Sequence, residues 1–103
     1  MNDERHLLKM LELVQKIRSY CHQLSYEDFI SDSMLTEACV FNLTQLGETA
    51  HKISSECTSL HPELAWNELY GLRNRLVHDY SGTNFNLVWE IITEDLPKLE
   101  QQI

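Results

Sequence analysis

Glycine and proline are scarce in this chain, and long uncharged apolar runs are missing. Three Gly and two Pro among 103 residues leave few positions for tight turns, so the sequence favours long helices. Charged residues interrupt every apolar stretch well before the ~20 residues that a membrane-spanning helix needs. The N-terminal residues Met1–Arg5 also lack the features of a secretory signal. We therefore expect a single cytoplasmic domain over residues 1–103, with no membrane segment.

The cysteines and histidines give little support for a disulfide or a metal site. Cys21, Cys39 and Cys57 are odd in number, and each lies where a helix would bury a small apolar side chain. The cysteines and histidines also lack the tight paired spacing of structural zinc sites. We expect no disulfide, no metal ion and no other cofactor.

Positive charge is scarce as well. Eight Lys and Arg residues stand against sixteen Asp and Glu residues, which gives a formal net charge of −8. Nonspecific affinity for nucleic acid comes mostly from cations that neutralise phosphates, so a DNA-coating role is disfavoured. The composition still allows an enzyme that contacts one or two phosphates in a local basic cleft.

Apolar residues recur every three or four positions along most of the chain, which predicts helices and no strands. A capping box at Ser25 and Asp28 predicts one further helical turn, and Pro97 is expected to kink or restart the last helix. The expected fold is an all-α, up-and-down antiparallel bundle of four long helices plus a short helical turn. The four helices are expected at residues 3–24, 35–57, from 65 to about 81, and 85–103.

Two arginines in the third helix, within residues 72–80 (Leu-Arg-Asn-Arg-Leu-Val-His-Asp-Tyr), differ in their expected surroundings. On a regular helix Arg73 projects between two apolar stripes, where an unpaired charge is costly. Its partner is expected to be a ligand or a carboxylate, and Glu48 on the second helix is the structural candidate. Arg75 points to the far side, one turn from Asp79, which is typical of a solvated pair.

His78 follows Arg73 by five residues, or about 140° around a regular helix. One straight helix therefore cannot direct both side chains at one phosphate. Either the helix is distorted or two chains share the site, and a two-fold dimer would bring both copies of the pair together.

Glycine inside a helix costs about 1 kcal/mol relative to alanine, so Gly47 suggests the close approach of another helix. The other histidines and both tryptophans are interpreted as surface or packing residues. They are His6, His22, His51, His61, Trp66 and Trp89.

Several short motifs together resemble the HepT-like toxins of the HEPN superfamily. Arg73, four residues and then His78-Asp79-Tyr80 resemble the Arg-x4-His-x-Tyr motif, and Asn74 resembles the polar residue that follows the arginine. Thr49, where the family often has Ala, and Ser81-Gly82, in place of a common aromatic, depart from the pattern. The resemblance covers most of residues 7–100 and includes Leu46-Gly47-Glu48 (Ile-Gly-Glu), His61-Pro62 through Trp66 (His-Pro-x-x-x-Trp), and Val88-Trp89 with Asp95-Leu96-Pro97 (the C-terminal helix).

The resemblance implies a HEPN-like helical bundle that dimerises around the motif and cleaves RNA without metal, leaving a 2′,3′-cyclic phosphate. Arg73 would hold the phosphoryl oxygens and His78 would act as base or acid. Asn74 would support them by orienting the phosphate or His78, although a capping or packing role is equally open. The implied partner is a nucleotidyltransferase antitoxin of the MNT type, which would adenylylate Tyr80.

The sequence also allows two other functions. The chain could be a noncatalytic binding module that presents substrate to the partner nucleotidyltransferase, which the acidic charge favours. It could also be a structural dimerisation domain in which Arg73 is only a salt-bridge partner. The presence of both Arg73 and His78 favours the ribonuclease.

Overall fold

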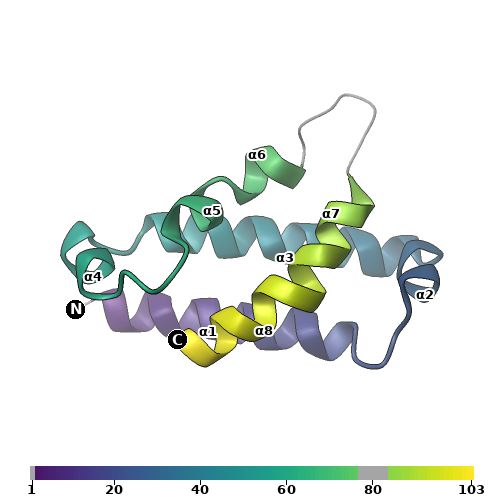
Figure 1. Ribbon diagram of the computed structural model, residues 1–103, viewed down its shortest axis with the longest axis horizontal. Coiled ribbons are helices and arrows are strands. Elements are labelled where there is room, and N and C mark those ends of the chain that lie inside the picture. Colours follow the sequence, from purple (N-terminus) through teal and green to yellow (C-terminus); the bar gives the residue numbers. More distant parts are fainter. Residues whose placement is uncertain (1, 77–83) are drawn as a thin grey trace.

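Two antiparallel helices of 19 residues each, α1 (Asn2–Tyr20) and α3 (Ser33–His51), form the base of the fold (Figure 1). The structure is a computed structural model that describes residues 2–76 and 84–103, and every regular element in these ranges is helical. The inward faces of α1 and α3 have the predicted spacing of buried apolar residues. They include Met10, Leu13, Val14 and Ile17 on α1, and Cys39, Leu43, Leu46 and Ala50 on α3.

The turn between the two long helices contains the predicted capping box. Helix α1 ends earlier than expected, and Gln23 takes a left-handed backbone conformation with a φ of 62°. The short helix α2 (Tyr26–Ile30) follows. The Asp28 N–H donates to Ser25 Oγ at 3.1 Å, and the Ser25 N–H donates to Asp28 Oδ2 at 3.1 Å, so the predicted cap is confirmed.

Helix α3 is shorter than the sequence predicted, because the chain turns at Ser54 and starts a new helix, α4 (Ser55–Leu60). Ser54 Oγ accepts a hydrogen bond from the Cys57 N–H at 3.2 Å and so caps α4. Ser54 also donates its N–H and its hydroxyl to the carboxylate of Asp3, at 3.0 and 2.6 Å, and these bonds hold the pKa of Asp3 below its usual value. The expectation of one helix through Cys57 is therefore wrong.

The predicted third helix is also interrupted. It consists of α5 (Trp66–Tyr70) and α6 (Leu72–Leu76), with a turn at Gly71 between them. Gly71 has φ −86° and ψ 2°, which departs from helical geometry, and glycine is a poor helix former. Both segments lie along one side of α3 and bury Leu69 and Leu72 there (Figure 1).

The C-terminal segment crosses α1 and α3 as one irregular helix (Figure 1). It consists of α7 (Phe85–Glu90), a π-helical turn η1 (Ile91–Asp95) and α8 (Leu96–Gln102). Pro97 has no N–H to donate to the preceding turn, and the π-helical turn lies immediately before it. The helix is thus disturbed at the predicted place, but it continues past the proline.

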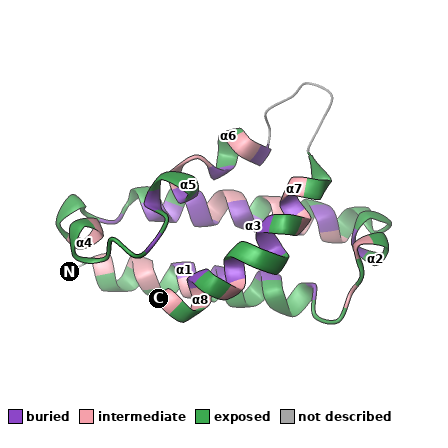
Figure 2. Cartoon of the chain, in the orientation of Figure 1, coloured by how far each residue is buried: buried purple, intermediate pink, exposed green. Residues whose placement is uncertain are grey.

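Buried side chains gather where α1, α3 and the C-terminal segment face one another (Figure 2). Phe29 of α2 joins them and packs against Trp89, with ring centroids 5.0 Å apart. The all-helical fold is confirmed, but only α1 and α3 are long among the described helices. No helix in the described ranges is long and apolar enough to cross a membrane.

Gly47 permits the close approach of α5 and α6 to α3. A Cβ atom at Gly47 would lie 2.8 Å from the Leu69 carbonyl oxygen and 3.3 Å from Leu72 Cβ. The predicted close helix approach is therefore confirmed. At Gly71, by contrast, an added Cβ would lie 3.5 Å from the Asn67 carbonyl oxygen, which is an ordinary contact.

We predict that Gly47→Ala destabilises the protein although alanine is the better helix former. Overpacking costs about 1–3 kcal/mol, which exceeds the gain of about 1 kcal/mol from helix propensity. Urea unfolding followed by circular dichroism measures the change. Gly71→Ala is the matched control and should change the free energy of unfolding by less than about 1 kcal/mol. Equal stability of the two variants would contradict the close approach at Gly47.

Candidate functional site

Arg73 and Asn74 lie on α6 and line a polar hollow of about 500 Å³. The volume falls within the range of about 300–1,000 Å³ that is usual for ligand sites. The other side chains around the hollow come from α5 and from the last turn of α3. Its described lining consists of Gly47, Glu48, His51, Lys52, Tyr70, Arg73 and Asn74.

The second half of the sequence motif falls outside the described residues. The expectations for His78 and Tyr80, and for pairing of Arg75 with Asp79, all concern residues 77–83. The structure therefore places Arg73, Asn74 and Glu48 at one hollow and leaves the roles of His78 and Tyr80 as predictions.

Arg73 is not enclosed between apolar stripes as expected. Its side chain is exposed, whereas Leu72 and Leu76 on the same short helix are buried. Glu48 is exposed too, and within the described part of the chain the two residues form no ion pair. The expected Glu48–Arg73 pair is thus not formed. An exposed guanidinium is hydrated by water and needs no carboxylate to offset its desolvation.

One side of the hollow is formed by two stacked rings, one from α3 and one from α5. The rings of His51 and Tyr70 are nearly parallel, with centroids 4.4 Å apart and an interplanar angle of 21°. His51 Nε2 also lies 3.3 Å from the Tyr70 carbonyl oxygen. The Trp66 and Tyr70 ring centroids are 6.3 Å apart, and the Trp66 Nε1–H donates to the His61 carbonyl oxygen at 2.9 Å. These contacts fix α5 against the end of α3.

Sequence reasoning missed His51 and Lys52 as residues of this hollow. The sequence predicts a surface or packing role for His51 and does not indicate a role for Lys52. The signal was available in the spacing, because the two residues follow Glu48 by three and four positions. Side chains at that spacing share one face of a helix.

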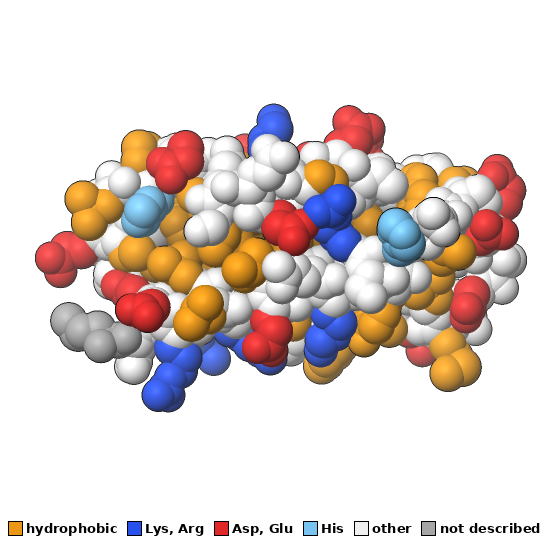
Figure 3. All heavy atoms as spheres, turned by 90° about the horizontal axis from the view of Figure 1, so that it is seen from below, with side chains coloured by type: hydrophobic (Ala, Val, Ile, Leu, Met, Phe, Trp, Pro, Cys, Tyr) orange, Lys and Arg blue, Asp and Glu red, His pale blue; other side chains and the backbone are white. Residues whose placement is uncertain are grey.

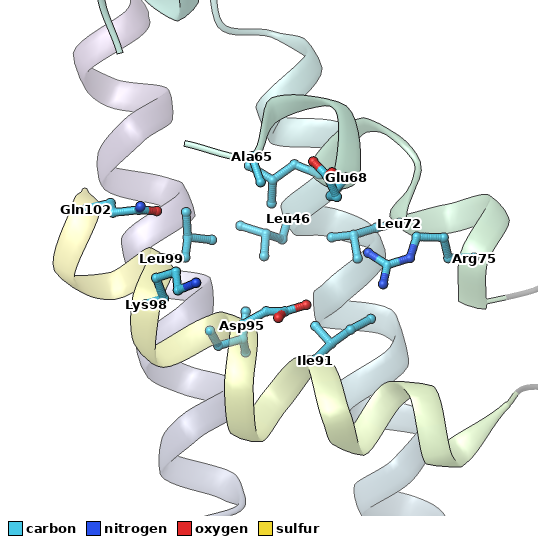
Figure 4. A pocket seen from close by; sticks show the side chains of 12 residues that line it. Leu46, Ala65, Glu68, Leu72, Arg75, Ile91, Asp95, Lys98, Leu99 and Gln102 are labelled. Carbon is cyan, nitrogen blue, oxygen red and sulfur yellow. The ribbon is translucent and has the colours of Figure 1, made fainter. Parts of the chain in front are cut away.

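Arg75 faces a different hollow from Arg73, which agrees with the rotation of about 200° between residues two positions apart on a helix. This second hollow, of about 240 Å³, is lined mainly by leucine and isoleucine side chains from α3, α5, α6 and the C-terminal segment. Arg75 and Asp95 point toward one another across it without forming an ion pair (Figure 4). Arg75 is half-buried rather than fully exposed, and its expected pairing with Asp79 involves a residue outside the described ranges.

The hollow at Arg73 contains more positive than negative side chains, in contrast to the chain as a whole. Its described lining contains two cationic side chains, Arg73 and Lys52, and one carboxylate, Glu48. Elsewhere, acidic and basic side chains are interspersed with apolar ones, as on the face shown in Figure 3. The guanidinium, ammonium and amide groups at the hollow are hydrogen-bond donors that suit an anionic ligand such as a phosphate.

No group of three or more His, Cys, Asp or Glu side chains within residues 2–76 and 84–103 is arranged to hold a metal ion. Within the described lining of the hollow, the cationic side chains are those of Arg73 and Lys52.

Comparison with known proteins gives one consistent family. The model of the family described as ribonuclease HepT-like matches residues 10–103. A candidate RNase of Caldanaerobacter subterraneus subsp. tengcongensis is 34% identical over 99 residues, which cover 95% of this chain and 85% of that protein. A candidate ribonuclease HepT of Thermococcus cleftensis is 30% identical, covering 92% of this chain and 86% of its own length. No solved structure matches the chain.

Proposed function

Because the chain belongs to the ribonuclease HepT-like family, we propose that it is a metal-independent endoribonuclease toxin of a HepT/MNT toxin-antitoxin pair. The observation that carries this proposal is the open, polar hollow to which Arg73 and Asn74 contribute. A phosphate there would meet a planar guanidinium that is always charged and can contact two phosphoryl oxygens at once. The names of the relatives, which are candidate ribonucleases, support RNA as the substrate.

The proposed reaction is an internal transesterification of RNA. The 2′-oxygen attacks the adjacent phosphorus while His78 removes the proton of the 2′-hydroxyl. The bond from phosphorus to the 5′-oxygen breaks, and the leaving oxygen takes a proton from the partner subunit's His78. Arg73 stabilises the negative charge that builds up on the phosphoryl oxygens, and Asn74 helps to orient the phosphate. The products are a 2′,3′-cyclic phosphate and a 5′-hydroxyl.

An exposed apolar stripe on α3 supports the proposed homodimer. Met34 and Phe41 are 83% and 62% exposed, and they lie seven residues apart, which puts them on one face of the helix. Glu48 follows after seven more residues, so the stripe leads to the hollow. A two-fold interface along this stripe would bury its apolar side chains and place the two copies of the motif near each other.

The proposed partner is a nucleotidyltransferase antitoxin that adenylylates Tyr80. An AMP group adds bulk and negative charge two residues from His78, which would repel an RNA phosphate. The alternative function is a noncatalytic module that presents substrate to this nucleotidyltransferase. The net charge of −8 favours that alternative, since it weakens attraction of RNA at long range.

We predict that the purified protein cleaves total RNA in excess EDTA, because Arg73 and His78 supply the cation and the base. Arg73→Lys should reduce cleavage by roughly 100-fold or more, since an ammonium cannot reproduce the two-point contact of a guanidinium. His78→Ala should abolish cleavage. Arg75→Lys is the matched control and should retain activity, because Arg75 faces the other hollow. Loss of cleavage in EDTA, or equal loss in both Lys variants, would overturn the site assignment.

We predict a homodimer at micromolar concentration by analytical ultracentrifugation, with Phe41 at its interface. Phe41→Glu should give monomers and lose cleavage, because a carboxylate would be buried against the apolar stripe. Leu60→Glu changes an apolar residue on α4 that is even more exposed and lies away from the stripe, and this variant should stay dimeric. A monomeric wild type would count against the dimer. A dimeric Phe41→Glu variant would show that the dimer interface does not include Phe41.

We predict that coexpression with the partner nucleotidyltransferase adds AMP to Tyr80. Intact-mass analysis should show the added mass on the wild type and on Tyr26→Phe, but not on Tyr80→Phe. The modified protein should bind RNA more weakly than the unmodified protein. An unchanged mass of the wild type would refute the modification.

A further inference from the structure

We propose that the hollow holds two neighbouring RNA phosphates, with Lys52 as the cation for the phosphate next to the one that Arg73 contacts. Lys52 would then be a substrate-positioning residue rather than a catalytic one. The inference rests on the proposed function in one respect, which is that the ligand of the hollow is RNA.

The first support is the placement of Lys52. It is the C-terminal cap of α3, it is exposed, and it lines the same hollow as Arg73 and Asn74. None of the ion pairs in the described part of the chain involves Lys52, so its ammonium group is not neutralised by a described carboxylate. Each phosphate along an RNA strand carries one negative charge, and two cations at one hollow therefore match two successive phosphates.

The second support is that the backbone segments carrying Lys52 and Arg73 are held in place by hydrogen bonds and packing. The Lys52 N–H donates to the Thr49 carbonyl oxygen at 3.0 Å, which holds its backbone in the last turn of α3. The stacked rings of His51 and Tyr70 join that turn to α5. The close contact at Gly47 then joins α3 to Leu72, the residue before Arg73. Lys52 and Arg73 thus approach a ligand from elements whose spacing is set by packing.

The third support is electrostatic. The chain has only eight Lys and Arg residues against sixteen Asp and Glu residues. Two of these eight cations line one hollow that has a single described carboxylate, Glu48. A local excess of positive charge in an otherwise acidic protein directs an anionic ligand to that place.

A purely structural role for Lys52 makes a different prediction. A lysine near a helix C-terminus is favoured by the helix dipole by about 0.3–1 kcal/mol, whether or not any ligand binds. Loss of that effect would lower the free energy of unfolding. It would not change how RNA binding depends on salt, because only a lost phosphate contact alters the number of counterions released.

The test is fluorescence anisotropy with a short, fluorescein-labelled single-stranded RNA whose 2′-hydroxyls are methylated, so that it cannot be cleaved. The affinity of the full-length protein is measured over a series of KCl concentrations. Lys52→Ala should weaken binding about fivefold to tenfold at low salt. It should also reduce the slope of log K against log salt by about 0.7, the value for one phosphate contact on a single strand. Lys52→Arg should restore the slope.

Lys16→Ala is the matched control, since Lys16 is an exposed lysine on α1 that does not line the hollow. It should leave affinity and slope unchanged, and circular dichroism should show that all variants are folded. With cleavable RNA, Lys52→Ala should raise KM and leave kcat nearly unchanged.

The outcomes separate the two proposals. If the wild type binds and cleaves RNA while Lys52→Ala keeps the wild-type slope, the phosphate contact is overturned and the ribonuclease stands. If the folded wild type neither binds nor cleaves RNA, the proposed function is overturned together with the inference.

Discussion

At Gly47 the backbone of α3 comes so close to α5 that an added Cβ would lie 2.8 Å from the Leu69 carbonyl oxygen. This contact sets the position of the candidate site, because Arg73 and Asn74 follow Leu72 directly on α6. Glycine at this position lowers the intrinsic stability of helix α3 by about 1 kcal/mol relative to alanine. Burial of Leu69 and Leu72 against α3 offsets that cost. A larger residue at this position would move α6, and with it the guanidinium, away from the last turn of α3.

Two interruptions of the helices border the same hollow. Helix α3 gives way to a turn after His51 because Ser54 caps the next helix and is bound by Asp3, so the side chain of Lys52 lies at the helix end. The break at Gly71 separates α5 from α6, and Arg73 is exposed while its neighbour Leu72 is buried. In a bundle of four uninterrupted helices, these positions would be parts of packed helix surfaces. The irregular backbone therefore creates an open, polar place beside a well-packed core.

The apolar spacing predicted α1, the start of α3 and their buried faces, because helical periodicity is a local property of the chain. It could not predict where α3 ends. The chain turns just before Ser54, which caps α4 locally and is also bonded by Asp3 across 51 positions of sequence. The π-helical turn was foreseeable only as a disturbance near Pro97, since the missing N–H can be accommodated by a kink, a restart or a wider turn. Gly71 falls within an otherwise regular apolar series, and its backbone angles in the structure show that it interrupts the helix.

The same limit explains which parts of the site were foreseen. Helical rotation correctly separated Arg73 from Arg75, because two positions turn a side chain by about 200°. The exposure of Arg73 was not predicted, since a helical wheel does not show which faces neighbouring helices cover. His51 and Lys52 were missed for a related reason: a histidine and a lysine at a helix end are ordinary surface residues until another helix brings Arg73 beside them. For a chain with few cations, the position of each one carries more information about a ligand than the net charge does.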